Sequence, residues 1–219
     1  MNKPISVIEI LEVLEDDYVL LKKWGGFPEY TPGSDVDLLV VDRQRASRSV
    51  QDYLIKTING EETILRVSDG KSHTHIDICE GKNIILRVDL IDGFDFFTKF
   101  AVQDALKIKI FLTRVAQKVG DFEVFIPCPD FDLLIRYLEY LEWFERRPDK
   151  IKHLDYILSH SDNAQREQLI ENTHRYIRFH HTRWHGKVPA KKGGFKKPFK
   201  IFWELVYKIQ KRLGIWKKD

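Results

Sequence analysis

The sequence predicts an α+β fold, with a mixed sheet and flanking helices in the first part and helices in the second. Short apolar runs, separated by glycine-containing turns, recur through residues 1–127 and alternate with segments of helical periodicity. From residue 128 onward, apolar and aromatic residues recur mainly at helical spacing. These two patterns indicate a sheet-containing domain followed by a helical part.

The composition is that of a globular protein with a substantial core. Hydrophobic residues make up 43% of the 219 residues. No apolar run approaches the roughly 18 residues that a membrane-spanning helix requires. The N-terminus shows an amphipathic pattern rather than the apolar core of a signal peptide. Cys79 and Cys128 have neither metal nor redox spacing, so we expect two buried, reduced thiols in a cytoplasmic protein.

The N-terminal segment is expected to form one helix and two strands. Residues 5–16 place apolar side chains among acids at helical spacing, which predicts a short amphipathic helix. Residues 18–21 and 36–41 are nearly continuous apolar runs, typical of strands in a buried sheet. Gly25-Gly26 lies between them and predicts a turn.

A helix and a three-stranded hairpin unit are expected next. Residues 43–58 carry one apolar face and end at an Asn-Gly pair, as a helix does. Three runs rich in β-branched residues follow, separated by Asp-Gly and Glu-Gly pairs that suit hairpin turns. These predicted strands are residues 63–67, 73–79 and 83–91.

The sheet-containing domain is expected to end near residue 127. Residues 95–118 show an apolar stripe at helical spacing and predict a long helix, and residues 122–126 predict a short strand. The Pro-Cys-Pro-Asp segment that follows suits the start of a helix, with Asp130 as its N-cap. We therefore place a domain boundary between residues 127 and 128.

The C-terminal part is predicted to be helical. An aromatic-rich stripe and two further periodic segments suggest a helical domain over residues 128–190. A Gly/Pro/Lys-rich linker and an amphipathic helix complete residues 191–219. The expected helices are residues 131–146, 149–160, 163–182 and 199–216, with the linker at 186–198.

Charge is distributed unevenly along the chain. Residues 191–219 hold ten Lys/Arg and two Asp/Glu, whereas the remaining residues hold 26 and 31. Aromatic residues beside lysines on the predicted terminal helix suit the surface of an anionic membrane, which predicts peripheral contact through residues 196–219. Packing of that helix on the body is an equal alternative. Nucleic acid is disfavoured as a partner because the body is acidic.

A pair of carboxylates opens the second predicted strand. Asp35 and Asp37 are two residues apart, so their side chains point to the same face of a strand. Like charges this close repel each other, and a cation between them relieves the repulsion. Mg²⁺ suits such oxygen-rich sites and binds through one or two carboxylates plus substrate phosphates. On these residues alone, an ordinary Asp-containing turn is an equal alternative.

Two later acids are candidates for a third metal ligand. Asp77 and Asp89 each lie between apolar residues of predicted strands, so both are expected to point inward. His73 and His75 share a face of the strand that carries Asp77. We interpret these histidines as exposed strand residues rather than substrate contacts.

The order of these elements resembles the DNA polymerase β-like nucleotidyltransferase superfamily. That family has a strand, a glycine turn, an Asp-x-Asp strand, a helix, and a hairpin whose last strand carries a third Asp. Here Gly25-Gly26 matches the turn, and Asp35 and Asp37 match the pair. The resemblance covers about residues 5–145 and implies a polymerase β-like mixed sheet.

The resemblance also implies an activity and a set of site residues. In that family the third acid lies on the last strand of the hairpin. The resemblance therefore implies Asp89, and not Asp77, as the third catalytic carboxylate and metal ligand. It implies two-metal phosphoryl transfer with Mg²⁺, or Mn²⁺ in its place. One ion would neutralise the triphosphate, and the other would lower the pKa of an acceptor hydroxyl. The expected nucleotide-binding residues are Gly25, Gly26, Ser34 and Lys23, with Lys22 and Arg43 as alternative triphosphate partners.

The expected partners are a nucleoside triphosphate, such as ATP, and a small-molecule acceptor. The whole chain is similar to nucleotidyltransferase-like proteins of bacterial surface-polysaccharide clusters, which implies a sugar or polyol acceptor. Two alternatives are open: a non-catalytic nucleotide-binding or toxin–antitoxin-type module on the same fold, and a transferase acting on protein or RNA. The enzyme hypothesis requires the three acids to converge on a solvent-open site.

Overall fold

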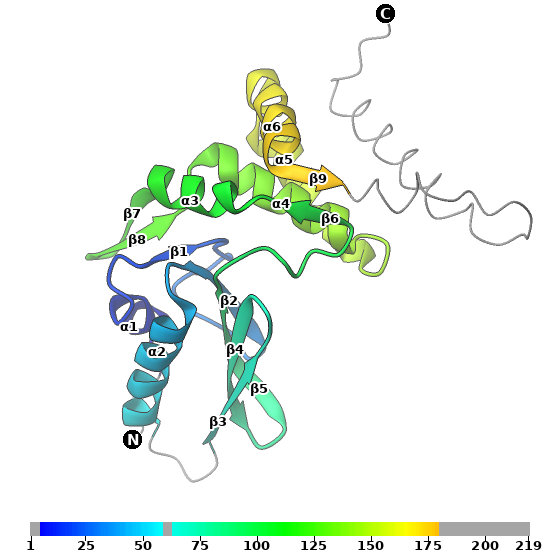
Figure 1. Ribbon diagram of the computed structural model, residues 1–219. Helices are drawn as coiled ribbons and strands as arrows, with labels where there is room; N and C mark the ends of the chain where they lie inside the picture. Colours follow the sequence, from blue (N-terminus) through cyan, green and yellow to red (C-terminus); the bar gives the residue numbers. More distant parts are fainter. Residues whose placement is uncertain (1–4, 59–62, 180–219) are drawn as a thin grey trace, which may run out of the picture. The chain divides into compact units, whose positions relative to one another are not determined.

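The computed structural model describes residues 5–58 and 63–179 (Figure 1). It divides into two compact units: unit 1 comprises residues 1–98 and 102–132, and unit 2 comprises residues 99–101 and 133–219. The predicted linker and terminal helix, and residues 180–182 of the predicted helix at 163–182, lie outside the described residues. The predicted helix is wrong at residues 177–179, which form a short strand instead. In the described part of the chain, no helix is long and apolar enough to cross a membrane.

Most of the elements expected in unit 1 are confirmed, which makes the fold α+β. The first helix begins after Ser6, whose hydroxyl accepts a hydrogen bond from the Glu9 N–H, and the second begins after Asp42, which accepts one from the Arg45 N–H. The elements are α1 (Val7–Glu12), β1 (Tyr18–Leu20), β2 (Ser34–Val40), α2 (Arg43–Thr57), β3 (Thr63–Asp69), β4 (His73–Glu80) and β5 (Asn83–Ile91).

These strands form one mixed sheet of five strands in the order β1-β2-β5-β4-β3. Strand β2 runs parallel to β5, and the other neighbours are antiparallel. The two hairpins joining β3, β4 and β5 are those expected from the Asp-Gly and Glu-Gly pairs. At the second hairpin, Gly81 has φ 59°, a conformation that favours glycine. The parallel pairing places β2, which begins at residue 34, beside β5, which begins at residue 83.

Apolar residues of alternating strand positions form the main core of unit 1. Val36, Leu38 and Val40 of β2 are fully buried and pack in one cluster with the apolar faces of α1 and α2. Figure 1 shows both helices on the same side of the sheet. Because side chains alternate along a strand, the residues between these positions point to the opposite face. That assignment places Asp35 and Asp37 on the face away from α1 and α2.

One predicted element is wrong: residues 95–118 do not form a long helix. They form β6 (Phe100–Val102), α3 (Asp104–Thr113) and β7 (Val115–Val119), and β7 pairs with β8 (Phe122–Ile126) in a hairpin. Gly120, with φ 61°, makes the hairpin turn. The Arg114 guanidinium lies 4.4 Å from the ring centroid of Phe125, which fastens the end of α3 to β8.

Unit 2 is mainly helical and includes most of α4. Helix α4 begins at Pro129, where the Cys128 carbonyl accepts the N–H groups of Phe131 and Asp132, so Asp130 is inside the first turn and is not the N-cap. Asp162 caps the last described helix in a capping box with Gln165. The elements are α4 (Pro129–Trp143), η1 (Pro148–Lys150), α5 (Ile151–His160), α6 (Asn163–Tyr176) and β9 (Ile177–Phe179), which pairs with β6.

Both cysteines are free. Cys79 is buried in the sheet, as expected, whereas Cys128 is only half-buried and its thiol donates to the Thr113 hydroxyl at 3.6 Å. Hence only one of the two thiols belongs to the interior.

Candidate functional site

The three acids selected from the sequence lie on two neighbouring strands of the sheet. In the parallel pairing of β2 with β5, Asp37 is opposite Asp89, and Asp35 is opposite Arg87. Neighbouring strands lie about 4.8 Å apart, and residues in register share a face. The three carboxylates therefore emerge together on the face of the sheet that does not carry α1 and α2.

Polar residues continue across this face onto β4 and β3. His75 is in register with Asp89, Asp77 with Arg87, and Arg66 of β3 with Asp77. Further along the strands the same face becomes apolar, because Leu39 is fully buried and Ile91 nearly so. Asp37 and Asp89 are thus half-buried beside this apolar region, whereas Asp35 is exposed.

The two acids of β2 differ in their partners. Asp37 forms an ion pair with Lys22, with 3.1 Å between Oδ2 and Nζ. Asp35 is exposed and forms no ion pair among the described residues. Partial burial raises the pKa of Asp35, and the nearby Asp37 carboxylate raises it further, while Arg87 and Lys22 oppose the shift. Desolvation is thus the main cause of the raised pKa of Asp35, and the charge of Asp37 is the second.

Asp89 is paired with a histidine. The His75 Nδ1–H donates to the Asp89 carboxylate, and the Asp89 side chain is 17% exposed. Burial raises the pKa of Asp89 from 3.8 to about 6, despite the hydrogen bond from His75, which lowers it. Ionising this carboxylate in the folded chain costs free energy, because the group is partly shielded from water.

This cost predicts that Asp89→Asn stabilises the fold above pH 6. A carboxyl whose pKa is higher in the folded than in the unfolded chain lowers the free energy of unfolding as pH rises through the interval from 3.8 to about 6. Asparagine keeps an oxygen for His75 and has no charge. We expect a gain of about 1–2 kcal/mol at pH 7.5, shrinking as pH falls toward 4.

Urea unfolding at the two pH values measures this gain. Asp52→Asn is the matched control, since Asp52 is an exposed acid of α2. A loss of stability at pH 7.5 in the Asp89→Asn variant would show that Asp89 is needed as an anion by the fold itself.

Asp77, the other candidate for a third acid, is committed to two arginines. Its carboxylate accepts hydrogen bonds from Arg87 Nε at 2.6 Å and from Arg66 Nη2 at 2.8 Å. These hydrogen bonds, chiefly that from Arg87, hold the pKa of Asp77 below its ordinary value despite burial. Asp77 shares the face of the three acids but is already neutralised by protein groups.

The predicted phosphate-binding turn lies at the end of the sheet where β2 begins. Gly26 has φ 93°, which explains glycine there, whereas a Cβ on Gly25 would meet no atom within 4 Å. The Ser34 hydroxyl donates to the Thr31 carbonyl at 2.7 Å and accepts the Thr31 N–H, so it closes a local turn. A phosphate contact from Ser34 requires that turn to open.

The structure brings Lys22, rather than Lys23, to the acids. Lys23 Nζ donates to Gln117 of β7, while Lys22 pairs with Asp37. Arg43, the other alternative for the triphosphate, is used in the fold: Nη1 donates to the Gly70 and His73 carbonyls at 3.1 and 2.9 Å. Nε lies 3.2 Å from Asp92.

The sequence did not point to Arg87, and the interpretation of His75 as an exposed strand residue is wrong, because the half-buried His75 ring pairs with Asp89. Both stand at even spacing from residues that were selected, since Arg87 precedes Asp89 by two positions and His75 precedes Asp77 by two. Period-two alternation was therefore the available signal. Only the register of β4 on β5 places the His75 ring beside Asp89.

The donors of the site match Mg²⁺ in type. Carboxylate oxygens are its preferred protein ligands. After desolvation, the charge of Asp37 is the main cause of the raised pKa of Asp35, and a cation would relieve that repulsion. In residues 5–58 and 63–179, however, no group of three or more His, Cys, Asp or Glu side chains is placed closely enough to hold a metal ion. Asp35 and Asp37 are the pair that would hold one, and Asp89 is turned to His75.

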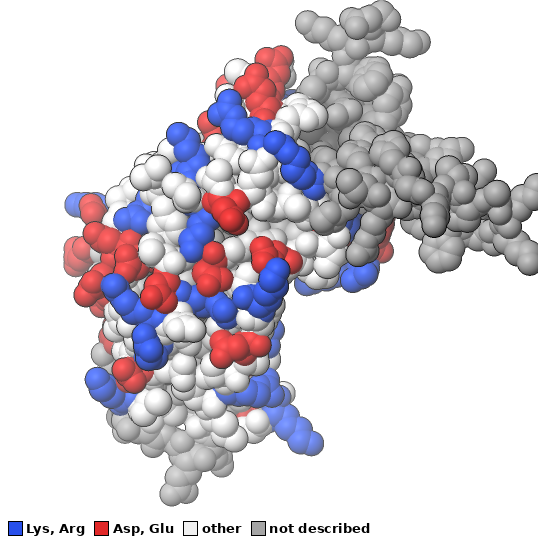
Figure 2. Space-filling model, viewed as in Figure 1, with Lys and Arg blue, Asp and Glu red and all other residues white. Residues whose placement is uncertain are grey.

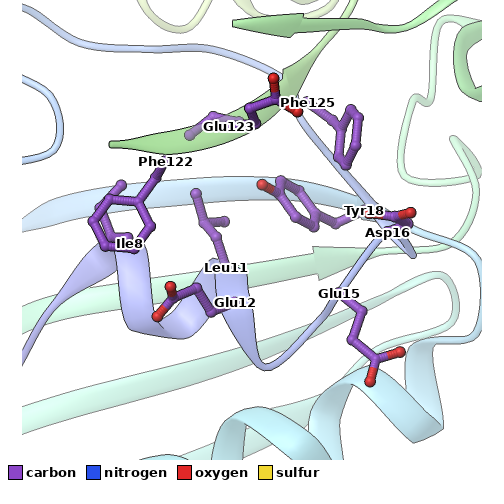
Figure 3. A pocket seen from close by; sticks show the side chains of 10 residues that line it. Ile8, Leu11, Glu12, Glu15, Asp16, Tyr18, Phe122, Glu123 and Phe125 are labelled. Atoms are coloured by element: carbon purple, nitrogen blue, oxygen red, sulfur yellow. The ribbon is translucent and has the colours of Figure 1, made fainter. Parts of the chain in front are cut away.

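A cavity of about 160 Å³ lies elsewhere in unit 1, between α1, β1 and β8 (Figure 3). Ile8, Leu11 and Phe122 make part of its apolar wall, and Glu12, Glu15 and other acids line it. Figure 2 shows acidic side chains gathered over α1 and the β7–β8 hairpin. None of the three acids of β2 and β5 lines this cavity.

In comparisons with protein-family models, curated proteins and solved structures, nothing matches this chain.

Proposed function

We propose that this chain is a nucleotidyltransferase with a polymerase β-like catalytic domain, which moves a nucleoside monophosphate from a nucleoside triphosphate to a small molecule. One observation carries the proposal: Asp35 and Asp37 of β2 and Asp89 of β5 emerge side by side on one face of the sheet. Three carboxylates in this arrangement serve phosphoryl transfer better than they serve stability, because two of them have raised pKa values.

The order of elements supports the same fold. A glycine turn follows β1, the Asp-x-Asp strand β2 follows the turn, and α2 then leads to the hairpin strands, the last of which carries Asp89. The mixed sheet that these elements form is compatible with a polymerase β-like domain.

A bound divalent ion, Mg²⁺ or Mn²⁺, would neutralise phosphate charge and acidify the acceptor hydroxyl. We assign Asp35 and Asp37 to hold it and Asp89 to accept the proton of that hydroxyl. The hydroxyl oxygen bonds to the α-phosphorus, and the bond from that phosphorus to pyrophosphate breaks. Lys22, next to Asp37, is the lysine placed to pair with a phosphate oxygen.

We propose a sugar, a polyol or one of their phosphates as the acceptor. The acids lie on the inner strands β2 and β5 of a sheet whose polar face carries three basic side chains, Lys22, Arg66 and Arg87, beside four acids. A long nucleic acid would need a broad basic surface. A small acceptor needs only the space beside the carboxylates.

The test combines binding with turnover. The full chain is titrated with each of the four nucleoside triphosphates in Mg²⁺, then incubated with α-labelled nucleotide and a panel of sugars, polyols and sugar phosphates while pyrophosphate is monitored. We expect Mg²⁺-dependent binding of a triphosphate and pyrophosphate release, both lost in Asp35→Asn and kept in Asp52→Asn. Nucleotide binding without turnover would favour the non-catalytic module. Binding or turnover that Asp35→Asn leaves unchanged would refute the site.

A further inference from the structure

A cluster of two arginines around one buried carboxylate lies beside the three acids, and the proposed reaction does not use it. Asp77, whose side chain is 4% exposed, accepts hydrogen bonds from Arg87 Nε and Nη2 at 2.6 and 3.0 Å. It also accepts them from Arg66 Nη2 and Nε at 2.8 and 3.3 Å. One carboxylate therefore holds two guanidinium groups, and the cluster has a net charge of +1.

Each guanidinium keeps donors that Asp77 does not use. A guanidinium has five N–H donors in a planar fork, and the hydrogen bonds to Asp77 occupy only its Nε and Nη2 side. The Nη1 groups of Arg66 and Arg87 donate to no group in the described part of the chain. Both side chains reach solvent, with exposed fractions of 59% for Arg66 and 30% for Arg87.

The cluster is close enough to the acids to serve the same substrates. Arg87 stands in register between Asp35 on one side and Asp77 on the other, and Arg66 is one strand further. With strands about 4.8 Å apart, the guanidinium groups lie one to three strand spacings from the carboxylates. A single substrate can span that distance, with its reacting group at the acids and a phosphate group at the arginines.

We propose that Arg66 and Arg87 form a subsite for a phosphate group of a substrate whose reacting centre lies at Asp35, Asp37 and Asp89. This inference rests on the proposed function for the position of that centre. Two guanidinium groups fixed by Asp77 present several N–H donors to the oxygens of a phosphate at little cost in side-chain entropy. The phosphate belongs either to the acceptor or to the end of the triphosphate.

The charges on this face predict that the subsite depends on Mg²⁺. Asp35, Asp37, Asp77 and Asp89 outnumber the three basic side chains by one negative charge, which disfavours a bound anion. A divalent cation reverses that balance. Phosphate is therefore expected to bind more tightly in Mg²⁺ than in its absence.

Isothermal titration of the full chain in Mg²⁺ tests the subsite, with Arg66→Gln as the variant. Asp77 retains Arg87 in that variant, so the fold is kept, and unchanged thermal unfolding verifies this. Arg48→Gln is the matched control, because it removes the same charge from an exposed position of α2, on the other side of the sheet. Arg66→Gln is expected to weaken binding of the phosphate-bearing ligand about tenfold or more, and Arg48→Gln less than about twofold.

Two titrations distinguish the source of the phosphate. If the phosphate belongs to the acceptor, Arg66→Gln weakens the binding of inorganic phosphate, which is added together with a non-hydrolysable ATP analogue. The affinity for MgATP is then unchanged. If it is the γ-phosphate of the triphosphate, Arg66→Gln weakens the binding of MgATP but not that of MgADP. Equal affinities of wild type and Arg66→Gln in both titrations overturn the subsite, even where Asp35→Asn abolishes MgATP binding. MgATP binding that survives Asp35→Asn refutes the proposed function instead.

Discussion

Asp35→Asn or Asp37→Asn is expected to lower kcat for nucleotidyl transfer by about a thousandfold or more. Both carboxylates project from β2 on the face shared with Asp89. Asparagine preserves the size of each side chain while removing the charge that holds a divalent ion. Because the two residues hold the same ion, the double variant is expected to lose no more than either single variant.

Single-turnover kinetics of the four proteins, wild type, D35N, D37N and the double variant, measure this effect. Stability is followed in parallel, since removing one of two repelling carboxylates relieves the repulsion that raises the pKa of Asp35. Losses that multiply in the double variant would indicate two independent roles, and a loss below about tenfold in both single variants would contradict the metal assignment.

Asp77→Ala is expected to lower the free energy of unfolding by about 3 kcal/mol at pH 7. Asp77 is the buried centre of the arginine cluster, and four hydrogen bonds from Arg66 and Arg87 end on it. Without Asp77, the half-buried Arg87 guanidinium faces Asp35 and Asp89 alone and a cavity remains in β4. The pKa of Asp77 is lowered in the folded chain, so its contribution is present at neutral pH and is lost as pH falls below 4.

Denaturant unfolding at pH 7 and pH 3 checks both the size and the sign. Arg66→Gln supplies the comparison, because an exposed side chain screened by solvent is expected to contribute far less to stability than the buried carboxylate that it pairs with. An Asp77→Ala loss that matches that of Arg66→Gln would show that Asp77 stabilises the sheet only through an exposed ion pair.

These two expectations separate the acids that we propose for catalysis from the acid that we expect to stabilise the fold. Asp77 has a lowered pKa because protein cations fully satisfy it, whereas Asp35 and Asp89 have raised pKa values on the same face. A fold that needed only solubility would have no reason to keep Asp89 partly buried. This contrast between neighbouring residues supports the proposed site on this face of the sheet.

Much of unit 1 could be predicted because its elements are locally determined. The Asp-x-Asp pair in front of an apolar run predicted a strand with two acids on one face, and β2 has that form. The three runs after residue 63 were recognised as hairpin strands because glycine-containing turns separate them. The prediction of a helix over residues 95–118 was wrong because the apolar residues of this segment fit a helical stripe and a hairpin equally. Val115–Val119 forms a strand because it pairs with β8.

The sequence by itself determined the α+β class, the strands of the five-stranded sheet, and which residues of each of these strands share a face, because alternation and turn chemistry are local properties. Only the tertiary structure showed that Asp89 lies beside Asp37 and that Lys22, not Lys23, pairs with Asp37. It also showed that two arginines enclose Asp77. The physical reason is register. The parallel pairing of β2 with β5 joins segments far apart in the chain, and burial of Val36, Leu38, Val88 and Leu90 selects that pairing without any signal in the acids themselves.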